Sequence, residues 1–107
     1  MIKLDIEPIP YQEFLTPFEG QFIRIILNFR QGQWLMSFKF NEKELNSLKL
    51  SSGVLMLAGQ NLPFEIVIDD KGSGLDPFSI ESFSNGFFDF LILDRSEISS
   101  IRGFEVE

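Results

Sequence analysis

The stretch FFDFLIL, residues 87–93, is apolar on both faces of the strand it predicts. Successive side chains of a β-strand point to opposite sides, and a strand with one face in water alternates apolar and polar residues. One face carries Phe88, Phe90 and Ile92, the other carries Phe87, Leu91 and Leu93, and only Asp89 is polar. Both faces of this strand must therefore be covered, either by the chain itself or by a partner.

The length and composition limit what can provide that cover. With 107 residues the chain is large enough for one modest core and too short for two, so we expect a single domain, 1–107. It contains no cysteine and no histidine. The absence of cysteine excludes disulfides and thiolate chemistry. The absence of histidine removes the commonest general base and metal ligand at neutral pH. We expect no enzyme, with no catalytic residues, no cofactor and no metal.

Alternation of apolar and polar residues recurs along most of the chain. It predicts strands at residues 22–29 and 34–40, joined by a short glycine turn at 31–33, and another strand at 64–69. Residues 41–49 fit either a helical turn or a turn that leads into a short strand at Ser47 to Leu50, and we favour the strand.

Other segments carry weaker signals. We predict short strands at residues 53–59 and 78–84, a mobile surface loop at 69–77, and either a short helix or a final strand ending in Phe104 and Val106 for the tail. About seven short strands, with turns every 8 to 12 residues, predict an all-β fold. The architecture expected is a small antiparallel β-barrel or sandwich.

The charge distribution limits which classes of partner are possible. Residues 1–64 hold six acids and six bases, whereas residues 65–107 hold ten acids and three bases, so the second half supplies the whole net charge of −7. Binding to phosphate groups needs a basic face, so nucleic acid is not an expected partner. The acidic half is either a solvated surface or an end that docks on a basic neighbour.

The N-terminus MIKLDIEPIP has neither the cationic leader nor the long apolar core of a signal peptide. No apolar run reaches the roughly 18 residues needed to cross a bilayer. We therefore expect a soluble, unsecreted protein with no membrane partner.

An aspartate cluster is the best candidate for a cation site. Asp69, Asp70 and Asp76 surround a Gly-Ser-Gly sequence, and calcium prefers several oxygen ligands on a flexible loop. The spacing differs from the twelve-residue EF-hand loop, and Asp and Gly are common in turns. A solvated turn is therefore the favoured interpretation, and cation binding stays open.

The phenylalanines give the strongest functional signal. The chain has thirteen Phe, one Tyr and one Trp, and five of the Phe lie between residues 78 and 90. Exposed apolar patches larger than a few hundred Å² generally contact another protein, and aromatic residues are enriched at such interfaces. The interface candidates are Phe83, Phe87, Phe88, Phe90, Leu91 and Leu93. The alternative is a strand that is packed on both faces within the chain.

The first half of the sequence carries a resemblance. A proline-containing lead precedes Gln12 and Phe14, Gly20 follows in a turn, and the predicted strand 22–29 leads to a return strand with Trp34. In this order these features resemble a family of small phage tail or baseplate proteins of otherwise unknown function. The resemblance extends to the apolar element at 52–57 and to the strand at 87–93.

The resemblance implies a non-enzymatic structural subunit of a bacteriophage tail or baseplate that acts by protein–protein assembly. Such a subunit would be made in the host cytoplasm and located in the virion tail. Its partners would be other tail or baseplate proteins, or copies of itself as a homo-oligomer.

Two other functions stay open from the residues alone. A small-ligand or peptide-binding β-barrel could line a cavity with its Phe side chains. An enzyme could use paired carboxylates, such as Glu42 with Glu44 or Glu105 with Glu107, for acid–base chemistry. Nothing in the sequence marks either pair as buried or convergent.

Overall fold

The structure is a computed structural model that describes residues 1–100. It has seven strands and one short helix: β1 (Ile2–Leu4), β2 (Tyr11–Phe18), β3 (Gln21–Arg30), β4 (Gln33–Phe40), β5 (Lys43–Lys49), β6 (Phe64–Asp69), β7 (Asp89–Asp94) and α1 (Arg95–Ser100). The strands form a four-stranded sheet in the order β2-β3-β4-β5 and a three-stranded sheet in the order β1-β7-β6. Every pairing within them is antiparallel. The predicted all-β class with about seven short strands is confirmed.

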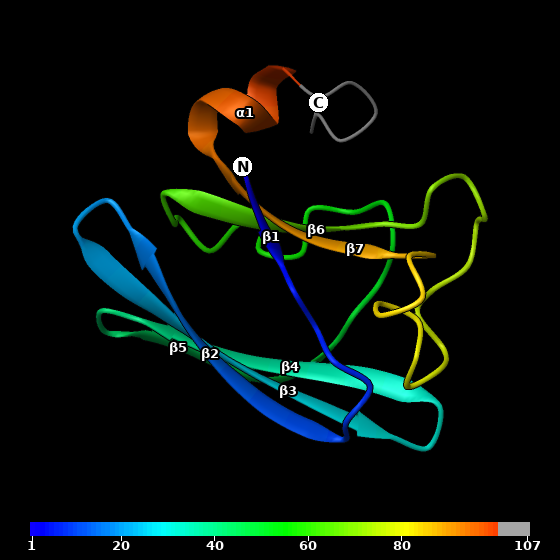
Figure 1. The fold of residues 1–107 in the computed structure, drawn as a ribbon. Coiled ribbons are helices and arrows are strands. Elements are labelled where there is room, and N and C mark those ends of the chain that lie inside the picture. Colours follow the sequence, from blue (N-terminus) through cyan, green and yellow to red (C-terminus); the bar gives the residue numbers. More distant parts are fainter. Residues whose placement is uncertain (101–107) are drawn as a thin grey trace.

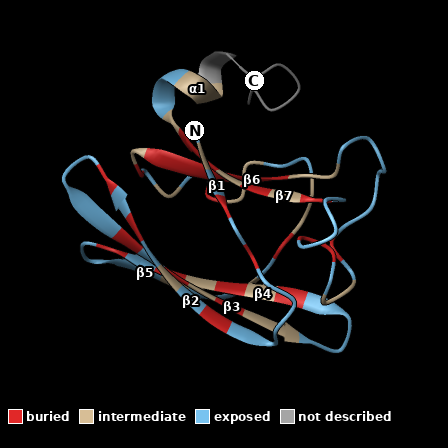
Figure 2. Cartoon of the chain, viewed as in Figure 1, coloured by how far each residue is buried: buried red, intermediate tan, exposed pale blue. Residues whose placement is uncertain are grey.

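The two sheets face each other, which makes the fold a sandwich and not a single closed barrel (Figure 1). Alternate residues of each strand point into the space between them, where Ile25, Leu27, Ile66 and Phe90 have no exposed surface. Figure 2 shows buried residues along the strands of both sheets. These residues belong to one hydrophobic cluster that spans both sheets.

The four-stranded sheet is built from hairpins between neighbouring segments. Glu19-Gly20 joins β2 to β3 and Gln31-Gly32 joins β3 to β4, and all four residues have positive φ angles, between 51° and 79°. Two-residue turns with this backbone match the right-handed twist of paired strands. The predicted hairpin at residues 31–33 is therefore present.

Three predicted elements differ from the structure. The favoured strand at 47–50 is present but longer and earlier than expected, because β5 runs over Lys43–Lys49. Residues 53–59 form no strand, and only single backbone hydrogen bonds, from Gly53 to Ile68 and from Met56 to Ile66, connect them to the edge strand β6. Residues 78–84 coil into turns around the Ser82 hydroxyl, which accepts the N–H groups of Phe78 and Ser79.

The ends of the described chain also differ in part from expectation. β1 and β2 are strands that the alternation did not single out. The tail forms a short helix, α1, which is one of the two predicted possibilities. The predicted strand at Phe104 and Val106 lies outside the described residues.

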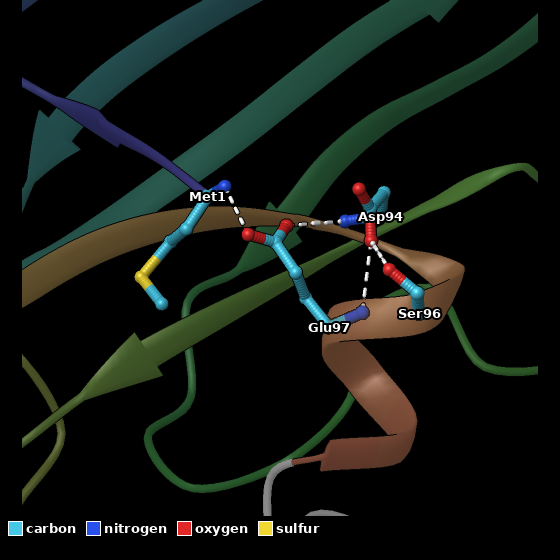
Figure 3. Close-up of polar contacts among 4 residues, drawn as sticks. All are labelled: Met1, Asp94, Ser96 and Glu97. Atoms are coloured by element: carbon cyan, nitrogen blue, oxygen red, sulfur yellow. Dashed lines mark hydrogen bonds and ion pairs between the residues drawn. The ribbon is translucent and has the colours of Figure 1, made fainter.

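A capping interaction starts the helix at Asp94 (Figure 3). The N–H of Glu97 donates to the Asp94 carboxylate at 2.8 Å, and the N–H of Asp94 donates to the Glu97 carboxylate at 2.9 Å. This reciprocal pair is a capping box. The second Glu97 oxygen pairs with the N-terminal amine of Met1, which lowers the pKa of Glu97, and so links β1 to α1.

The helix lies on the outer face of the three-stranded sheet, away from the four-stranded sheet (Figure 1). On that face Val67 and Leu93 are 1% and 0% exposed. The second apolar face of residues 87–93 is therefore covered largely within the chain. No helix among the described residues is long and apolar enough to cross a membrane.

Candidate protein interface

The structure separates the six predicted interface residues. Phe83, Phe88, Phe90 and Leu93 are buried within the chain, Leu91 is half-buried, and Phe87 is 65% exposed. The Phe83 ring packs edge-on against Trp34, with ring centroids 5.6 Å apart. The four buried residues therefore contribute to the core, and the prediction that they contact a partner is corrected. An apolar side chain on a predicted strand can be covered by the opposite sheet, by a helix or turn of the same chain, or by a partner, and the local pattern does not distinguish these.

Phe87 lines a surface groove at one end of the sandwich. The groove has a volume of about 470 Å³ and lies between residues 70–78 and residues 86–88. Leu75, Phe78 and Phe87 line it and are 53%, 57% and 65% exposed, while the buried Phe88 also contributes to the lining. A groove of this size and apolar character is suited to binding an apolar side chain.

The loop on one side of the groove is held by its own aspartates. The Asp70 carboxylate accepts the N–H of Gly72 at 3.0 Å and the N–H of Gly74 at 2.8 Å. Asp69 accepts the N–H of Lys71 at 2.9 Å. These are short-range turns in which Asp side chains replace backbone acceptors, so the loop has a defined hydrogen-bonded shape.

The other side of the groove is fixed through the core. The Trp34 indole N–H donates to the Ser79 carbonyl at 2.9 Å, which ties the turn segment to β4. The Asn85 side chain accepts the N–H of Phe87 at 3.0 Å, and the N–H of Phe88 donates to the Ser82 carbonyl at 3.2 Å. These bonds hold Phe87 outside the sheet and explain why β7 starts only at Asp89.

The segment that forms the groove is acidic. Residues 69–89 contain five acids and one base, a net charge of −4. That base, Lys71, lies 3.4 Å from the Asp89 carboxylate, whose other oxygen lies 3.3 Å from Lys3. Asp69, Asp70, Asp76 and Glu81 form no ion pair with any residue that the structure describes.

The three loop aspartates do not converge on a common point. Asp76 accepts the N–H of Ser52 at 2.9 Å, whereas Asp69 and Asp70 bind N–H groups of their own turn. Within residues 1–100 no group of three or more acidic side chains is arranged to hold a metal ion. Their observed role is to shape the loop.

A second apolar surface lies on the outer face of the four-stranded sheet. Tyr11, Leu15 and Phe22 are 54%, 64% and 57% exposed there. Arg24 and Glu13 form an ion pair across β2 and β3, and this contact raises the pKa of Arg24. Alternation with charged residues makes this face typical of a sheet that is open to water.

Glu65 is a buried carboxyl on the outer face of β6, 4% exposed. It accepts the N–H groups of Leu57 and Ile66, and burial raises its pKa despite these bonds and the nearby Arg95. Arg95 donates to the Leu62 carbonyl. Glu65 borders a pocket of about 320 Å³ and is the one carboxylate among those lining residues that the structure describes.

The carboxylate pairs suggested by the sequence do not form such a site. Glu42 lies in the turn between β4 and β5, Glu44 lies in β5, and both are exposed. Glu105 and Glu107 lie outside the described residues. The general acid–base pair that an enzyme of this kind requires is therefore not assembled by Glu42 and Glu44.

Sequence reasoning missed Leu75 as a groove residue. Its signal is visible in hindsight, because Leu75 is the one large apolar residue in the turn-rich stretch DDKGSGLDP and has no strand to bury it. Phe78 is similar, since it follows Pro77 outside any strand of the structure.

Comparison with known proteins adds no relative: no protein-family model matches the sequence, and no curated protein matches it.

Proposed function

We propose that this chain is a non-enzymatic structural subunit of a bacteriophage tail or baseplate, which acts by binding another protein through the groove at Leu75, Phe78 and Phe87. The observation that carries the proposal is the exposure of these three apolar side chains around one preformed groove. Soluble proteins rarely expose such clusters without a partner. The resemblance around Gln12, Gly20 and Trp34 supplies the phage context.

The edges of the four-stranded sheet favour assembly through side chains over addition of strands. Pro17 lies in the edge strand β2 and has no N–H to donate. The other edge strand, β5, has an irregular register opposite Met36 and Phe38 and a positive φ of 58° at Ser47. Proline and bulges at edges discourage pairing with another chain.

Gene context and particle composition test the phage role. Genes for a tape-measure protein, a hub and a sheath are expected beside this one. The chain is expected in purified particles, and antibody labelling in electron micrographs should mark the tail. Deletion of the gene should yield particles with incomplete tails that the wild-type gene restores. Complete, infective particles without the chain would refute the proposal.

The matched variants Phe87→Asp and Phe22→Asp test the groove in the same assay. Both positions are exposed, so neither change buries a charge and both proteins are expected to fold. Phe87→Asp should fail to restore tails, whereas Phe22→Asp should restore them. Equal restoration by both variants would exclude the groove as the assembly surface.

A peptide-binding domain outside any phage particle is the second candidate function. The same groove favours it, because its volume suits a side chain of an extended peptide. Groove-dependent binding by a chain that is absent from particles would favour this second function.

A further inference from the structure

We infer that the groove accepts a partner segment with one large apolar anchor residue flanked by lysine or arginine. This inference deepens the proposed function and rests on it, because it states the chemistry of the partner at the same site. Three properties of the groove carry it: its apolar lining, its hydrogen-bonded walls and its charge.

The apolar lining calls for a large apolar anchor. Leu75, Phe78 and Phe87 expose more than half of their surface, and Phe88 is 2% exposed. An aromatic or aliphatic side chain that covers these rings removes apolar surface from water on both partners. Central apolar anchors of this kind carry most of the affinity at protein interfaces.

The walls of the groove are formed before any partner arrives. The Asp70 side chain accepts the N–H groups of Gly72 and Gly74. In the same way, Asn85 accepts the N–H of Phe87 and Ser82 accepts the N–H of Phe78. A partner therefore has few loop residues to order on this side of the interface. Preorganisation of this kind increases affinity because less conformational entropy is lost on binding.

The charge of the groove segment selects the flanking residues. Residues 69–89 carry a net charge of −4, and Lys71 is already engaged by Asp89. Asp70 lines the groove and Asp76 follows Leu75 in the chain, and neither carboxylate forms an ion pair within residues 1–100. Such a surface attracts a basic segment and repels an acidic one.

A second copy of the chain is a poorer fit for this groove. The acidic half of a second copy would place like charges together. The outer face of the four-stranded sheet lies in residues 11–49, which hold four acids and five bases and therefore offer little complementary charge. Self-association through the groove without peptide binding would overturn the inference.

Nuclear magnetic resonance titration of the isotopically labelled 107-residue chain provides the test. The probes are three synthetic peptides: GSKRFSKRSG with basic flanks and one apolar anchor, GSKRASKRSG without the anchor, and GSEDFSEDSG with acidic flanks. The first peptide should shift the amide signals of residues 70–75 and 86–88. The second and third should bind at least about tenfold more weakly at low salt, through loss of the anchor and reversal of charge, respectively.

Three variants locate the binding and separate its two components. Phe87→Ser should weaken the first peptide at least about tenfold, whereas the matched control Phe22→Ser should leave its affinity unchanged. Lys71→Gln removes the base beside the groove and should tighten binding severalfold, an effect that added salt should reduce. Dispersed amide signals of each variant establish that it is folded.

Several results would overturn the inference. One is equal affinity for the basic and acidic peptides, and another is a set of amide shifts confined to residues 11–49. The others are an equal loss of peptide affinity in Phe87→Ser and Phe22→Ser, and groove-dependent self-association without peptide binding. If the peptides fail while gene deletion still removes tails, the partner chemistry is wrong and the phage role stands. If the peptides bind as expected but particles lack the chain, the phage role is wrong and the groove chemistry stands.

Discussion

The two sheets differ in how many of their faces are buried. The four-stranded sheet has one face in the core and one open to water, where exposed Phe22 and Leu15 alternate with charged residues such as Arg24. The three-stranded sheet buries residues on both faces, with Phe90 inside the sandwich and Leu93 on the outer side. An apolar residue on an outer face is therefore not in itself a sign of a partner.

The difference follows from where the strands come from in the chain. β2 to β5 are consecutive segments joined by short turns, so their sheet forms from local pairings. The three-stranded sheet combines β1 from one end of the chain with β6 and β7 from its second half. Its outer face is next to α1, which follows β7 directly.

Loss of the Phe90 ring should have the largest effect of the changes compared here. Phe90→Ala leaves a cavity between the sheets and should lower the free energy of unfolding by about 3–5 kcal/mol. Phe22→Ala, on the open face, should change it by less than about 0.5 kcal/mol. Urea denaturation followed by circular dichroism measures both. Similar losses would mean that the outer face of the four-stranded sheet is also packed.

Leu93 tests whether the outer face of the three-stranded sheet is a true core. Leu93→Ala should cost about 2–4 kcal/mol, because the residue is fully buried. Leu15→Ala, at a residue that is 64% exposed, is the matched control and should cost less than about 0.5 kcal/mol. A small loss for Leu93→Ala in the same denaturation experiment would show that α1 covers this face loosely.

The hairpin turns test the local origin of the four-stranded sheet. Gly32 has a φ of 76°, so Gly32→Ala should destabilise the protein by roughly 1 kcal/mol. Gly32→Asn should cost less, since Asn adopts positive φ more readily than Ala. Thermal melting of the two variants provides the comparison. Equal melting temperatures would show that backbone strain at this turn does not limit stability.

Glu65 should give the smallest effect, and one that depends on pH. Burial raises the pKa of Glu65 in the folded state, so the protein binds this proton more tightly when folded. The associated stability is present below the unfolded pKa and is lost as pH rises through the folded pKa. Glu65→Gln keeps an oxygen for the N–H groups of Leu57 and Ile66 but carries no charge.

The stability of Glu65→Gln relative to wild type should therefore increase from about pH 4 to neutral pH. Denaturant titrations of both proteins across this range measure the difference directly. Taking the difference removes the opposite trend from Asp94 and Glu97, whose lowered pKa values make stability fall in acid. A difference that is constant with pH would show that burial of Glu65 does not govern its ionisation.

Much of the fold was predictable because period-two alternation is a local property. It identified β3, β4 and β6, and the glycine at position 32 identified the turn between the first two. Alternation failed for residues 53–59 and 78–84, because a short apolar run fits a strand and an irregular core segment equally well. It did not single out β1, which depends on pairing with distant β7.

The candidate site was predictable only in part. Phe87 was identified from its sequence context, but Phe83, Phe88 and Phe90 were assigned to the same surface and lie in the core. Of the twelve Phe in the described residues, seven are buried and only Phe22, Phe78 and Phe87 are exposed. The chain thus covers most of its aromatic surface, and two of the three exposed rings line one groove.

The sequence by itself determined the strand-rich class, the inward faces of β3 and β4 and the acidic second half, because alternation, turn residues and charge act over a few neighbouring positions. Only the tertiary structure decided which apolar residues remain outside. That outcome depends on long-range pairing of β1, β6 and β7 and on the placement of α1. It also depends on the hydrogen bonds that the Asn85 and Ser82 side chains accept from the N–H groups of Phe87 and Phe78. Burial is a property of the whole packed chain, and no local pattern specifies it.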